Sequence, residues 1–313
     1  MASTLPVVIN RSGGTAAAMG VDLGYLVTRA FARAGRTIAL ELVDGCDVAF
    51  AIARHARAPL VAVGGGDGTL GAAAAALAHT STALAVLPLG TRNHLARQLG
   101  VPPDLDAAAA LAVSGRRRRI DLGTAGDRVF VNNASFGIYT RFVRQRDAAR
   151  GPKWLETLPA TWHALHRMRA QRFTLRIDGD RRCLRTPLLF VGNNEYALDL
   201  GRLGQRESLD DGCLSIRAVA AQDPLGLLAF AARAVFGLAR PERDFAEYGN
   251  AREIVIEGTG VIEGAFDGEL ARVALPLRLR SAAAALGVVT PYEDAPGGRE
   301  SGRGLLASRS RTP

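Results

Sequence analysis

The sequence is poor in lysine, which many phosphate-binding loops require. Of the 39 basic residues among 313, only Lys153 is a lysine. A Walker-type loop needs a lysine directly after its glycines, whereas Lys153 stands between Pro152 and Trp154. The Val-Ala-Ile-Lys and His-Arg-Asp elements of protein kinases are also missing. Both of these phosphate-handling classes are therefore excluded.

Cysteine and long apolar segments are scarce as well. The three cysteines, Cys46, Cys183 and Cys213, lie far apart and in no metal-ligand spacing, which favours a reducing compartment over a disulfide framework. No uninterrupted apolar run approaches the roughly 18 residues of a membrane span, since residues 225–239 contain Arg233. We therefore expect a cytoplasmic protein.

The most informative stretch that is present is a glycine-rich loop at residues 64–69, with the sequence GGGDGT. It follows the apolar run 60–63, so we expect a buried strand to end in a loop whose backbone amides can close on an anionic group. Asp67 is its one carboxylate. A phosphate with Mg²⁺ needs such an acid, whereas packing does not. The alternative is that Asp67 only caps the following helix.

A dinucleotide-binding loop is a second interpretation of the same glycines. Residues 66–71 match the pattern G-x-G-x-x-G after a strand. Such a site also needs an acidic residue about 20 positions later to bind the ribose. No Asp or Glu lies between Thr69 and Pro103, which weakens this interpretation.

The order of the expected elements predicts an α/β protein of two parts. Strands alternate with helices up to about residue 100, which indicates a doubly wound parallel sheet. Strands then follow in closer succession, which indicates an antiparallel β-sandwich with inserted helices. The expected strands are 5–9, 37–43, 60–63, 83–87, 128–132, 172–178, 182–191, 213–219, 252–257, 261–265 and 272–279, with a hairpin turn at 178–180. The expected helices include a stretch ending near 34, then 47–58, 69–78, one ending near 100, 154–170 and 224–239.

These elements predict the domain organisation. We expect a nucleotide-binding α/β domain at residues 1–122 and a β-sandwich lipid-substrate and metal domain at 123–280. Residues 281–293 are expected to return and pack on the N-terminal domain. Residues 294–313 have no apolar periodicity and are expected to be a disordered tail.

Five motifs in a fixed order resemble the diacylglycerol kinase catalytic-domain family of bacterial lipid kinases, within the superfamily that also contains the NAD kinases. Their joint occurrence is more specific than any one of them. The motifs are NRSGG at 10–14, GGDGT at 65–69, PLGTRN at 88–93, LDDG at 209–212 and FDGE at 266–269.

The resemblance implies a two-domain fold with ATP in the cleft and Mg²⁺-dependent transfer of the γ-phosphoryl group to a lipid hydroxyl, as in diacylglycerol. Asp267 would be the general base, and Asp67 with Mg²⁺ would neutralise the transferring phosphoryl group. The ATP site would comprise Asn10, Ser12, Gly13, Gly65, Gly66, Asp67, Gly68, Thr69, Thr91 and Asn93. A metal site would use Ser208, Asp211 and Cys213, and Arg11 and Glu269 are candidate contacts to substrate or phosphate.

Other interpretations stay open. An NAD kinase is favoured by the glycine motif and by the segment Asn-Asn-Glu at 193–195, which resembles that family's Asn-Glu element, while PLGTRN and FDGE oppose it. A non-catalytic nucleotide- or lipid-binding regulator of the same fold is another, although both Asp67 and Asp267 are retained. Alone, the FDGE motif would be a hairpin turn and LDDG a solvated turn. His94 also stands where the family usually has aspartate.

Charge does not by itself choose a partner. The net charge of +9 suits nucleic acid, anionic lipid or nucleotide equally. The basic segment 150–172 carries Trp154 and Trp162 at helical spacing, so peripheral contact with an anionic membrane at its inner face is one hypothesis, and a core-facing helix is the other. We expect a lipid alcohol as partner and no nucleic acid, and leave a homodimer open.

Overall fold

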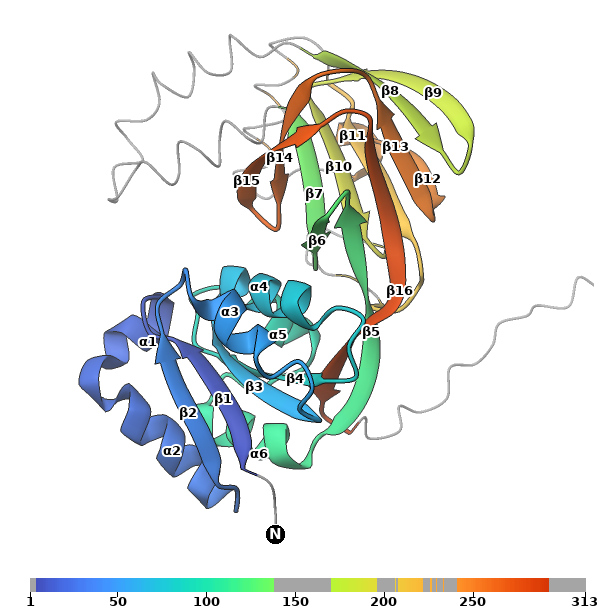
Figure 1. Ribbon diagram of the computed structural model, residues 1–313. Helices are drawn as coiled ribbons and strands as arrows, with labels where there is room; N and C mark the ends of the chain where they lie inside the picture. Colours follow the sequence, from blue (N-terminus) through green and yellow to red (C-terminus); the bar gives the residue numbers. More distant parts are fainter. Residues whose placement is uncertain are drawn as a thin grey trace, which may run out of the picture.

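The computed structural model describes residues 4–137, 170–195, 206, 208–221, 226, 229, 233 and 241–292. It consists of two lobes, one above the other in Figure 1, joined by two long strands. We call residues 5–114 the N-terminal lobe and residues 127–274 the C-terminal lobe. The helices expected at 154–170 and 224–239, apart from positions 170, 226, 229 and 233, and the expected tail lie outside the described residues.

The N-terminal lobe is built on a parallel sheet in the order β2-β1-β3-β4-β16. Its strands consist largely of Val, Ile, Leu and Ala because helices cover both faces of the sheet. The strands are β1 (Leu5–Asn10), β2 (Ile38–Val43), β3 (Leu60–Gly65), β4 (Ala83–Pro88) and β16 (Leu277–Thr290).

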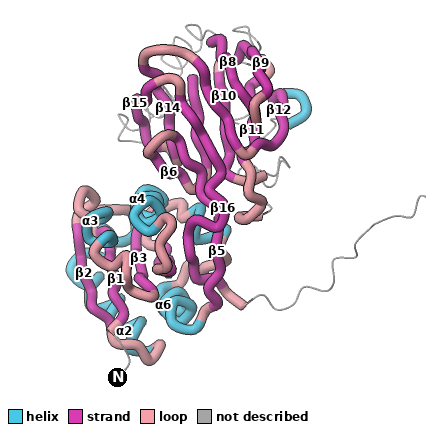
Figure 2. Tube along the Cα trace, turned by 45° about the vertical axis from the view of Figure 1, so that its right-hand side comes forward, coloured by secondary structure: helices cyan, strands magenta, loops and turns pink. Residues whose placement is uncertain are grey.

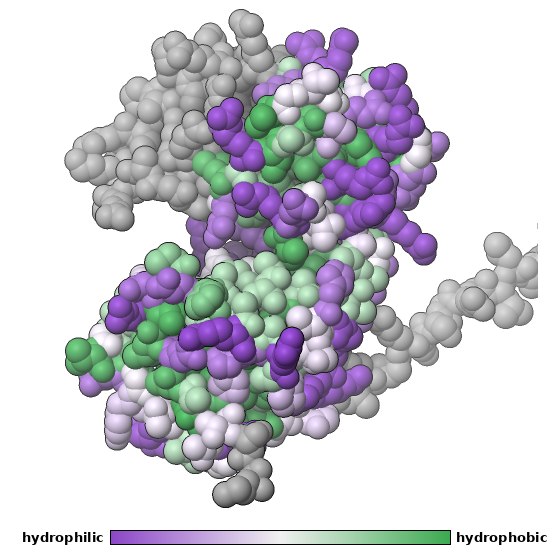
Figure 3. Space-filling view, viewed as in Figure 1, coloured by the Kyte–Doolittle hydropathy of each residue, from purple (hydrophilic) through white to green (hydrophobic). Residues whose placement is uncertain are grey.

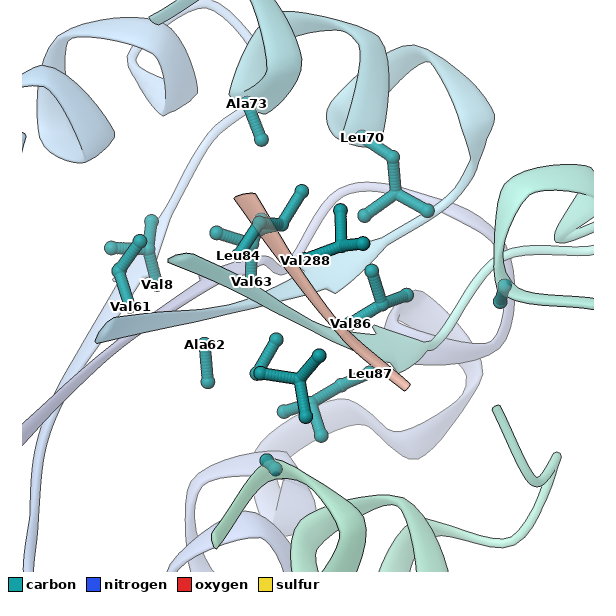
Figure 4. Close-up of a cluster of buried hydrophobic side chains, with 14 of the residues drawn as sticks. Val8, Val61, Ala62, Val63, Leu70, Ala73, Leu84, Val86, Leu87 and Val288 are labelled. Carbon is teal, nitrogen blue, oxygen red and sulfur yellow. The ribbon is translucent and has the colours of Figure 1, made fainter. Parts of the chain in front are cut away.

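The alternation of side chains along these strands fixes the two layers of the core. Figure 4 shows Leu70 and Ala73 of α4 over Val63, Val86 and Val288 of the sheet, while Leu87 points to the other face. Helices α3 and α4 pack on the first face, and α2 and α6 on the second. The helices are α1 (Gly14–Met19), η1 (Gly20–Asp22), α2 (Leu23–Arg33), α3 (Val48–Ala53), α4 (Asp67–Leu77), α5 (His94–Gln98) and α6 (Leu105–Ser114).

The C-terminal lobe is a sandwich of two antiparallel layers over a second apolar core. One layer is a six-stranded sheet in the order β12-β11-β10-β7-β14-β15, and the other is the upper part of the first sheet. The remaining elements are β5 (Arg116–Ala125), β6 (Arg128–Phe130), β7 (Asn133–Gly137), β8 (Gln171–Ile177), β9 (Asp180–Thr186), β10 (Leu188–Asn193), β11 (Leu214–Val219), α10 (Pro241–Asp244), β12 (Phe245–Ala251), β13 (Glu253–Glu257), β14 (Val261–Phe266) and β15 (Glu269–Ala274).

Strands β5 and β16 run through both lobes, as Figure 2 shows. They pair antiparallel along most of their length, while β16 also pairs with β4 below and with β13 above. The expected domain boundaries at 122 and 280 fall inside these two strands. The buried Asp121 of β5 ties the crossing point together, since its carboxylate accepts the backbone N–H groups of Gly212 and Ala284, each at 2.7 Å.

The predicted fold class is confirmed, with corrections to single elements. The expected strands 182–191 and 272–279 are each two strands, because Pro187 and Pro276 cannot donate to a ladder. The expected helix 47–58 is shorter, as α3 ends at Ala53. Helix α6 and strands β5, β7 and β12 were not expected, and the arginine run 116–119 lies in β5.

The hairpin turn predicted at 178–180 is present, with Asp178 and Gly179 at φ 45° and 100°. In the described part of the chain, no helix combines the length and apolar character that crossing a bilayer requires.

Candidate functional site

Three loops meet where parallel strands β1, β3 and β4 end. A Cβ added to Gly90 would lie 2.2 Å from the Cα of Gly66, and one added to Gly14 would lie 2.9 Å from the Cα of Gly90. The loops therefore pack backbone against backbone, with no room for a side chain at Gly90. Gly14 also has φ +52°, which favours glycine. The glycines of the three motifs thus build one continuous wall.

The glycine loop leads directly into α4. Gly66 is the N-cap, so the N–H groups of the first turn, at Asp67, Gly68 and Thr69, have no partner within the helix. Asp67 is the first residue of α4 and not its N-cap, and its Oδ1 accepts the N–H of Leu95 in α5 at 3.4 Å. The structure therefore does not support the interpretation of Asp67 as a mere helix cap.

The loop after β1 is fixed by side-chain hydrogen bonds. Asn10 donates from Nδ2 to the Oγ1 of Thr69 at 2.9 Å and accepts the N–H of Ser12 at 3.0 Å. Arg11 and Ser12 both donate to Asp44, at 2.8 Å and 2.7 Å. These bonds, that from Arg11 first, hold the pKa of Asp44 well below its usual range. Arg11 and Ser12 are thus engaged with the loop that follows β2.

Asn93 shapes the loop after β4 from a left-handed backbone, φ 50°. Its Nδ2 donates to the carbonyls of Pro88 and Gly90 at 3.2 Å and 2.7 Å, and its Oδ1 accepts the N–H of Gly90 at 2.9 Å. The side chain therefore closes the turn that brings Gly90 against the glycine loop.

Asp267 occupies the hairpin turn between β14 and β15, at φ 50°, followed by Gly268 at φ 87°. The turn is present, and its side chain makes long-range bonds as well. Its Oδ2 accepts the N–H of Val131 at 2.6 Å, and its Oδ1 accepts those of Asn132 and Asn133 at 2.7 Å and 3.1 Å. Burial raises the pKa of Asp267, against the lowering effect of these N–H groups and of the Arg206 charge.

The two lobes face each other across a cavity of about 730 Å³. Figure 3 shows the notch between them, with the pale green, alanine-rich α4 on its lower side. A Cβ added to Gly68 would lie 2.9 Å from the Oε1 of Glu269, and one added to Gly71 would lie 3.9 Å from the Oδ2 of Asp267. The first turns of α4 therefore stand directly opposite the turn that carries Asp267 and Glu269.

Most of the predicted ATP and catalytic residues reach this cavity. Ser12, Gly65 and Asn93 do not line it, since Ser12 bonds Asp44, Gly65 lies against the side chain of Thr69, and Asn93 lies inside its own loop. The predicted residues that line the cavity are Asn10, Gly13, Gly66, Asp67, Gly68, Thr69, Thr91, Asp267 and Glu269.

The charged groups around the cavity are mostly carboxylates. Asp67, Asp127, Asp267 and Glu269 line it, and Arg128 is the one basic residue among the described lining residues. The guanidinium of Arg128 lies over the ring of Phe266, 6.0 Å from its centroid. A polyphosphate entering such a cavity would need a cation to offset the repulsion, and carboxylate oxygens are the ligands that Mg²⁺ prefers. The donor set therefore fits a divalent cation shared between protein and phosphate.

The predicted metal residues Ser208, Asp211 and Cys213 lie away from the cavity, beside the crossing strands. Asp211 accepts the N–H of Glu195 at 3.4 Å, and the carbonyl of Cys213 accepts the N–H of Asn194 at 2.9 Å. Burial raises the pKa of the Cys213 thiol. Among the described residues, no three His, Cys, Asp or Glu side chains are grouped to hold a metal ion.

Several residues at or behind the cavity were missed from the sequence. Asp127 lies in the turn between β5 and β6, Arg128 begins β6, and no motif marked either residue. Arg206 is buried behind Asp267 and bonds the carbonyl of Val131, as does Asn193, which the sequence marked only as part of the 193–195 segment. Their contacts join segments about 60 to 75 positions apart, which local sequence patterns do not indicate.

Comparison with known proteins gives one family match. Residues 4–125 match the model described as "Diacylglycerol kinase catalytic domain". This match covers the N-terminal lobe and β5, and ends before the segment that carries Asp267.

Two curated relatives extend the similarity. A protein of Cronobacter sakazakii named "Probable lipid kinase YegS-like" is 32% identical over 184 residues, which is 55% of this chain and 60% of that protein. "Probable lipid kinase YegS" of Salmonella gallinarum is 30% identical over 189 residues, or 56% of this chain and 61% of that protein. The matches thus span less than two thirds of these relatives.

The fold recurs in solved structures. A crystal structure described as a diacylglycerol kinase from Bacillus anthracis str. Sterne superimposes with a TM-score of 0.66 at 22% identity. The superposition covers 92% of this chain and 96% of that one. At this identity the likeness shows that the two-lobed fold is shared over nearly the whole length.

Proposed function

We propose that the protein is a lipid kinase of the diacylglycerol kinase catalytic domain family, whose model matches residues 4–125 of the chain. It transfers the γ-phosphoryl group of ATP to the hydroxyl of a lipid alcohol such as diacylglycerol. The observation that carries this proposal is the cavity in which the first two turns of α4 face Asp267 and Glu269. The surface that would bind the phosphates of ATP and the group that would accept the lipid proton thus lie in the same cavity.

The N-terminal lobe holds the donor. The unpaired N–H groups at the start of α4 and the positive end of its dipole favour the phosphates of ATP. The backbone contact of Gly90 with Gly66 keeps these amides in place before ATP binds. Preorganised donors of this kind require little rearrangement during the reaction, which is how they lower its barrier.

The C-terminal lobe activates the acceptor. Asp267 accepts one N–H on Oδ2 and two on Oδ1, so Oδ2 keeps more capacity to accept a further hydrogen bond. Oδ2 is also the oxygen that faces α4, since a Cβ added to Gly71 would lie 3.9 Å from it. A lipid hydroxyl placed there would donate its proton to Oδ2 as its oxygen bonds to the γ-phosphorus, while the bond from that phosphorus to the bridging oxygen breaks and ADP leaves. The raised pKa of Asp267 makes it a better proton acceptor than an ordinary aspartate.

Mg²⁺ fits the proposed donor side. Asp67, with Glu269 or Asp127 across the cavity, would hold it together with the ATP phosphates, because Mg²⁺ commonly takes only one or two protein carboxylates. When bound, it would supply charge neutralisation. Arg128, which lies over the ring of Phe266 and lines the same cavity as Asp267, would add positive charge on the acceptor side during transfer.

A second cation is proposed at the lobe junction. The Asp211 carboxylate, with the carbonyls of Ser208 and Cys213, offers the oxygen ligands of a hard cation. Because these residues lie outside the cavity lining, the cation would support folding and take no part in catalysis. The domain division at 122 and 280, contact with an anionic membrane and a homodimer also remain proposals.

Radiolabelled ATP incubated with the protein, Mg²⁺ and a panel of acceptors tests the function. The panel holds diacylglycerol, a sphingoid base, a glycerophospholipid with a free hydroxyl, and NAD. We expect label in one or more lipids and none in NAD. Label in NAD alone would identify an NAD kinase, and ATP binding without transfer would identify a regulator.

A further inference from the structure

Helix α5 lies between the two carboxylates that the proposed function uses. At its start, the N–H of Leu95 donates to Asp67. At its end, the Oε1 of Gln98 accepts a hydrogen bond from the Nη2 of Arg206. This helix of the N-terminal lobe therefore contacts Asp67 directly and touches a residue that belongs to the C-terminal side of the cavity.

Arg206 connects this helix to the backbone around Asp267. Its Nη1 donates to the carbonyls of Val131 and Asn193 at 2.7 Å and 3.3 Å, and its Nη2 donates to the Oδ1 of Asn132 at 3.3 Å. Asn193 donates a second hydrogen bond to the Val131 carbonyl, at 2.9 Å. The carbonyl of Val131 is thus held by two buried donors.

The same segment supplies the hydrogen bonds to Asp267. We call the backbone N–H groups of Val131, Asn132 and Asn133 the amide cradle, because all three donate to its carboxylate. Asn193 and Arg206 bond this segment from behind. A shift of the segment would therefore move the oxygen that is proposed to accept the lipid proton.

We propose that Gln98 and Arg206 are positioning residues. Through α5, they fix the position of the amide cradle of Asp267 relative to the N-terminal lobe. This inference rests on the proposed function for the role of Asp267, although the contacts themselves do not. Arginine suits the task, because its planar fork bonds several acceptors in fixed directions, which a lysine cannot do. Displacement of a reacting group by about 1 Å can cost orders of magnitude in rate.

Variants at Gln98 separate positioning from charge, because they leave the Arg206 guanidinium in place. Gln98→Leu removes the acceptor at similar size, whereas Gln98→Glu keeps an oxygen for Arg206. We expect Gln98→Leu to lower kcat about tenfold with KM for ATP changed less than about twofold, and Gln98→Glu to restore most of kcat. Arg206→Lys should resemble Gln98→Leu, and the exposed Arg97→Ala on the same helix is the matched control.

Hydrogen–deuterium exchange of the full-length protein provides a readout that needs no catalysis. In Gln98→Leu we expect the amides of residues 131–133 to exchange about fivefold faster than in the wild type, and in Arg97→Ala to be unchanged. Unchanged exchange in both Gln98→Leu and Arg206→Lys would overturn the inference. Faster exchange in a protein whose wild type labels no lipid would instead overturn only the proposed function.

Discussion

The wall of the cavity that comes from the N-terminal lobe is largely backbone, whereas the wall from the C-terminal lobe presents charged side chains. Seven of its residues in the N-terminal lobe are glycines, among them Gly66, Gly68 and Gly90. The C-terminal wall has no glycine among its described residues, and Asp127, Arg128, Asp267 and Glu269 are all charged. One wall is suited to bind a polyanion and the other to move a proton.

Because of this difference, we expect the two walls to respond differently to substitution. Backbone donors are lost only when the loops are forced apart, so changes on the N-terminal wall act through sterics. A carboxylate held by distant amides loses its function when its charge is removed, with the fold intact. The variants below use this contrast, from the largest expected effect to the smallest.

Asp267→Asn tests the charged wall most directly. The amide is nearly isosteric but cannot take the lipid proton, so we expect kcat to fall about 1,000-fold while ATP binding is spared. Transfer from labelled ATP measures the first, and calorimetric titration with ATP measures the second. Glu269→Gln, across from Gly68, removes one of two alternative Mg²⁺ ligands but no proton acceptor, so kcat should fall far less. Activity that survived in Asp267→Asn would assign the proton to another group.

Gly90→Ala tests the backbone wall. Its Cβ would lie 2.2 Å from the Cα of Gly66, so the loops must separate, and we expect a loss of about 3 kcal/mol in the free energy of unfolding together with weaker ATP binding. Gly68→Ala is the matched control, because its Cβ meets only the movable carboxylate of Glu269. Urea unfolding and ATP titration of both variants make the measurement. Equal stability of the two would contradict the packing argument.

The same contrast explains what the sequence could predict. The phosphate side was accessible because each loop directly follows its strand, and strands β1, β3 and β4 bring their ends together in any parallel sheet of this type. Asp267 was found only through its motif, and local pattern alone favoured a bare hairpin turn there. Its partners Val131–Asn133 lie about 135 positions away, and Arg206 belongs to no motif. Contacts of that range come from the tertiary fold.

The pH dependence of the reaction should separate the walls as well. Burial raises the pKa of Asp267, and a base acts only when deprotonated. Activity should therefore be lost as pH falls through a value above the ordinary aspartate pKa of about 3.9. We expect kcat/KM for the lipid to show this acidic limb and ATP binding to depend less on pH, since backbone amides do not titrate. An acidic limb at or below the ordinary value would show that Asp267 is not the titrating base.

The smallest effect on stability and kinetics is expected for the exposed ion pair of Arg11 and Asp44, beside the N-terminal wall of the cavity. Arg11 and Asp44 are 57% and 47% exposed, so breaking their ion pair should leave the Tm almost unchanged at neutral pH. The pKa of Asp44 is lowered, so the stability it adds is present above the ordinary aspartate pKa and is lost only in acid. Stability therefore cannot distinguish the two residues at neutral pH.

Nucleotide affinity can distinguish them. If Arg11 exchanges Asp44 for a phosphate when ATP binds, Arg11→Ala should raise KM for ATP about threefold, whereas Asp44→Ala should leave it equal or lower, because the guanidinium is released. Steady-state kinetics at two salt concentrations measures this, since the Arg11 effect should shrink as salt screens it. Equal increases in both variants would mean that Arg11 serves the loop and that the backbone alone binds the phosphates on this side.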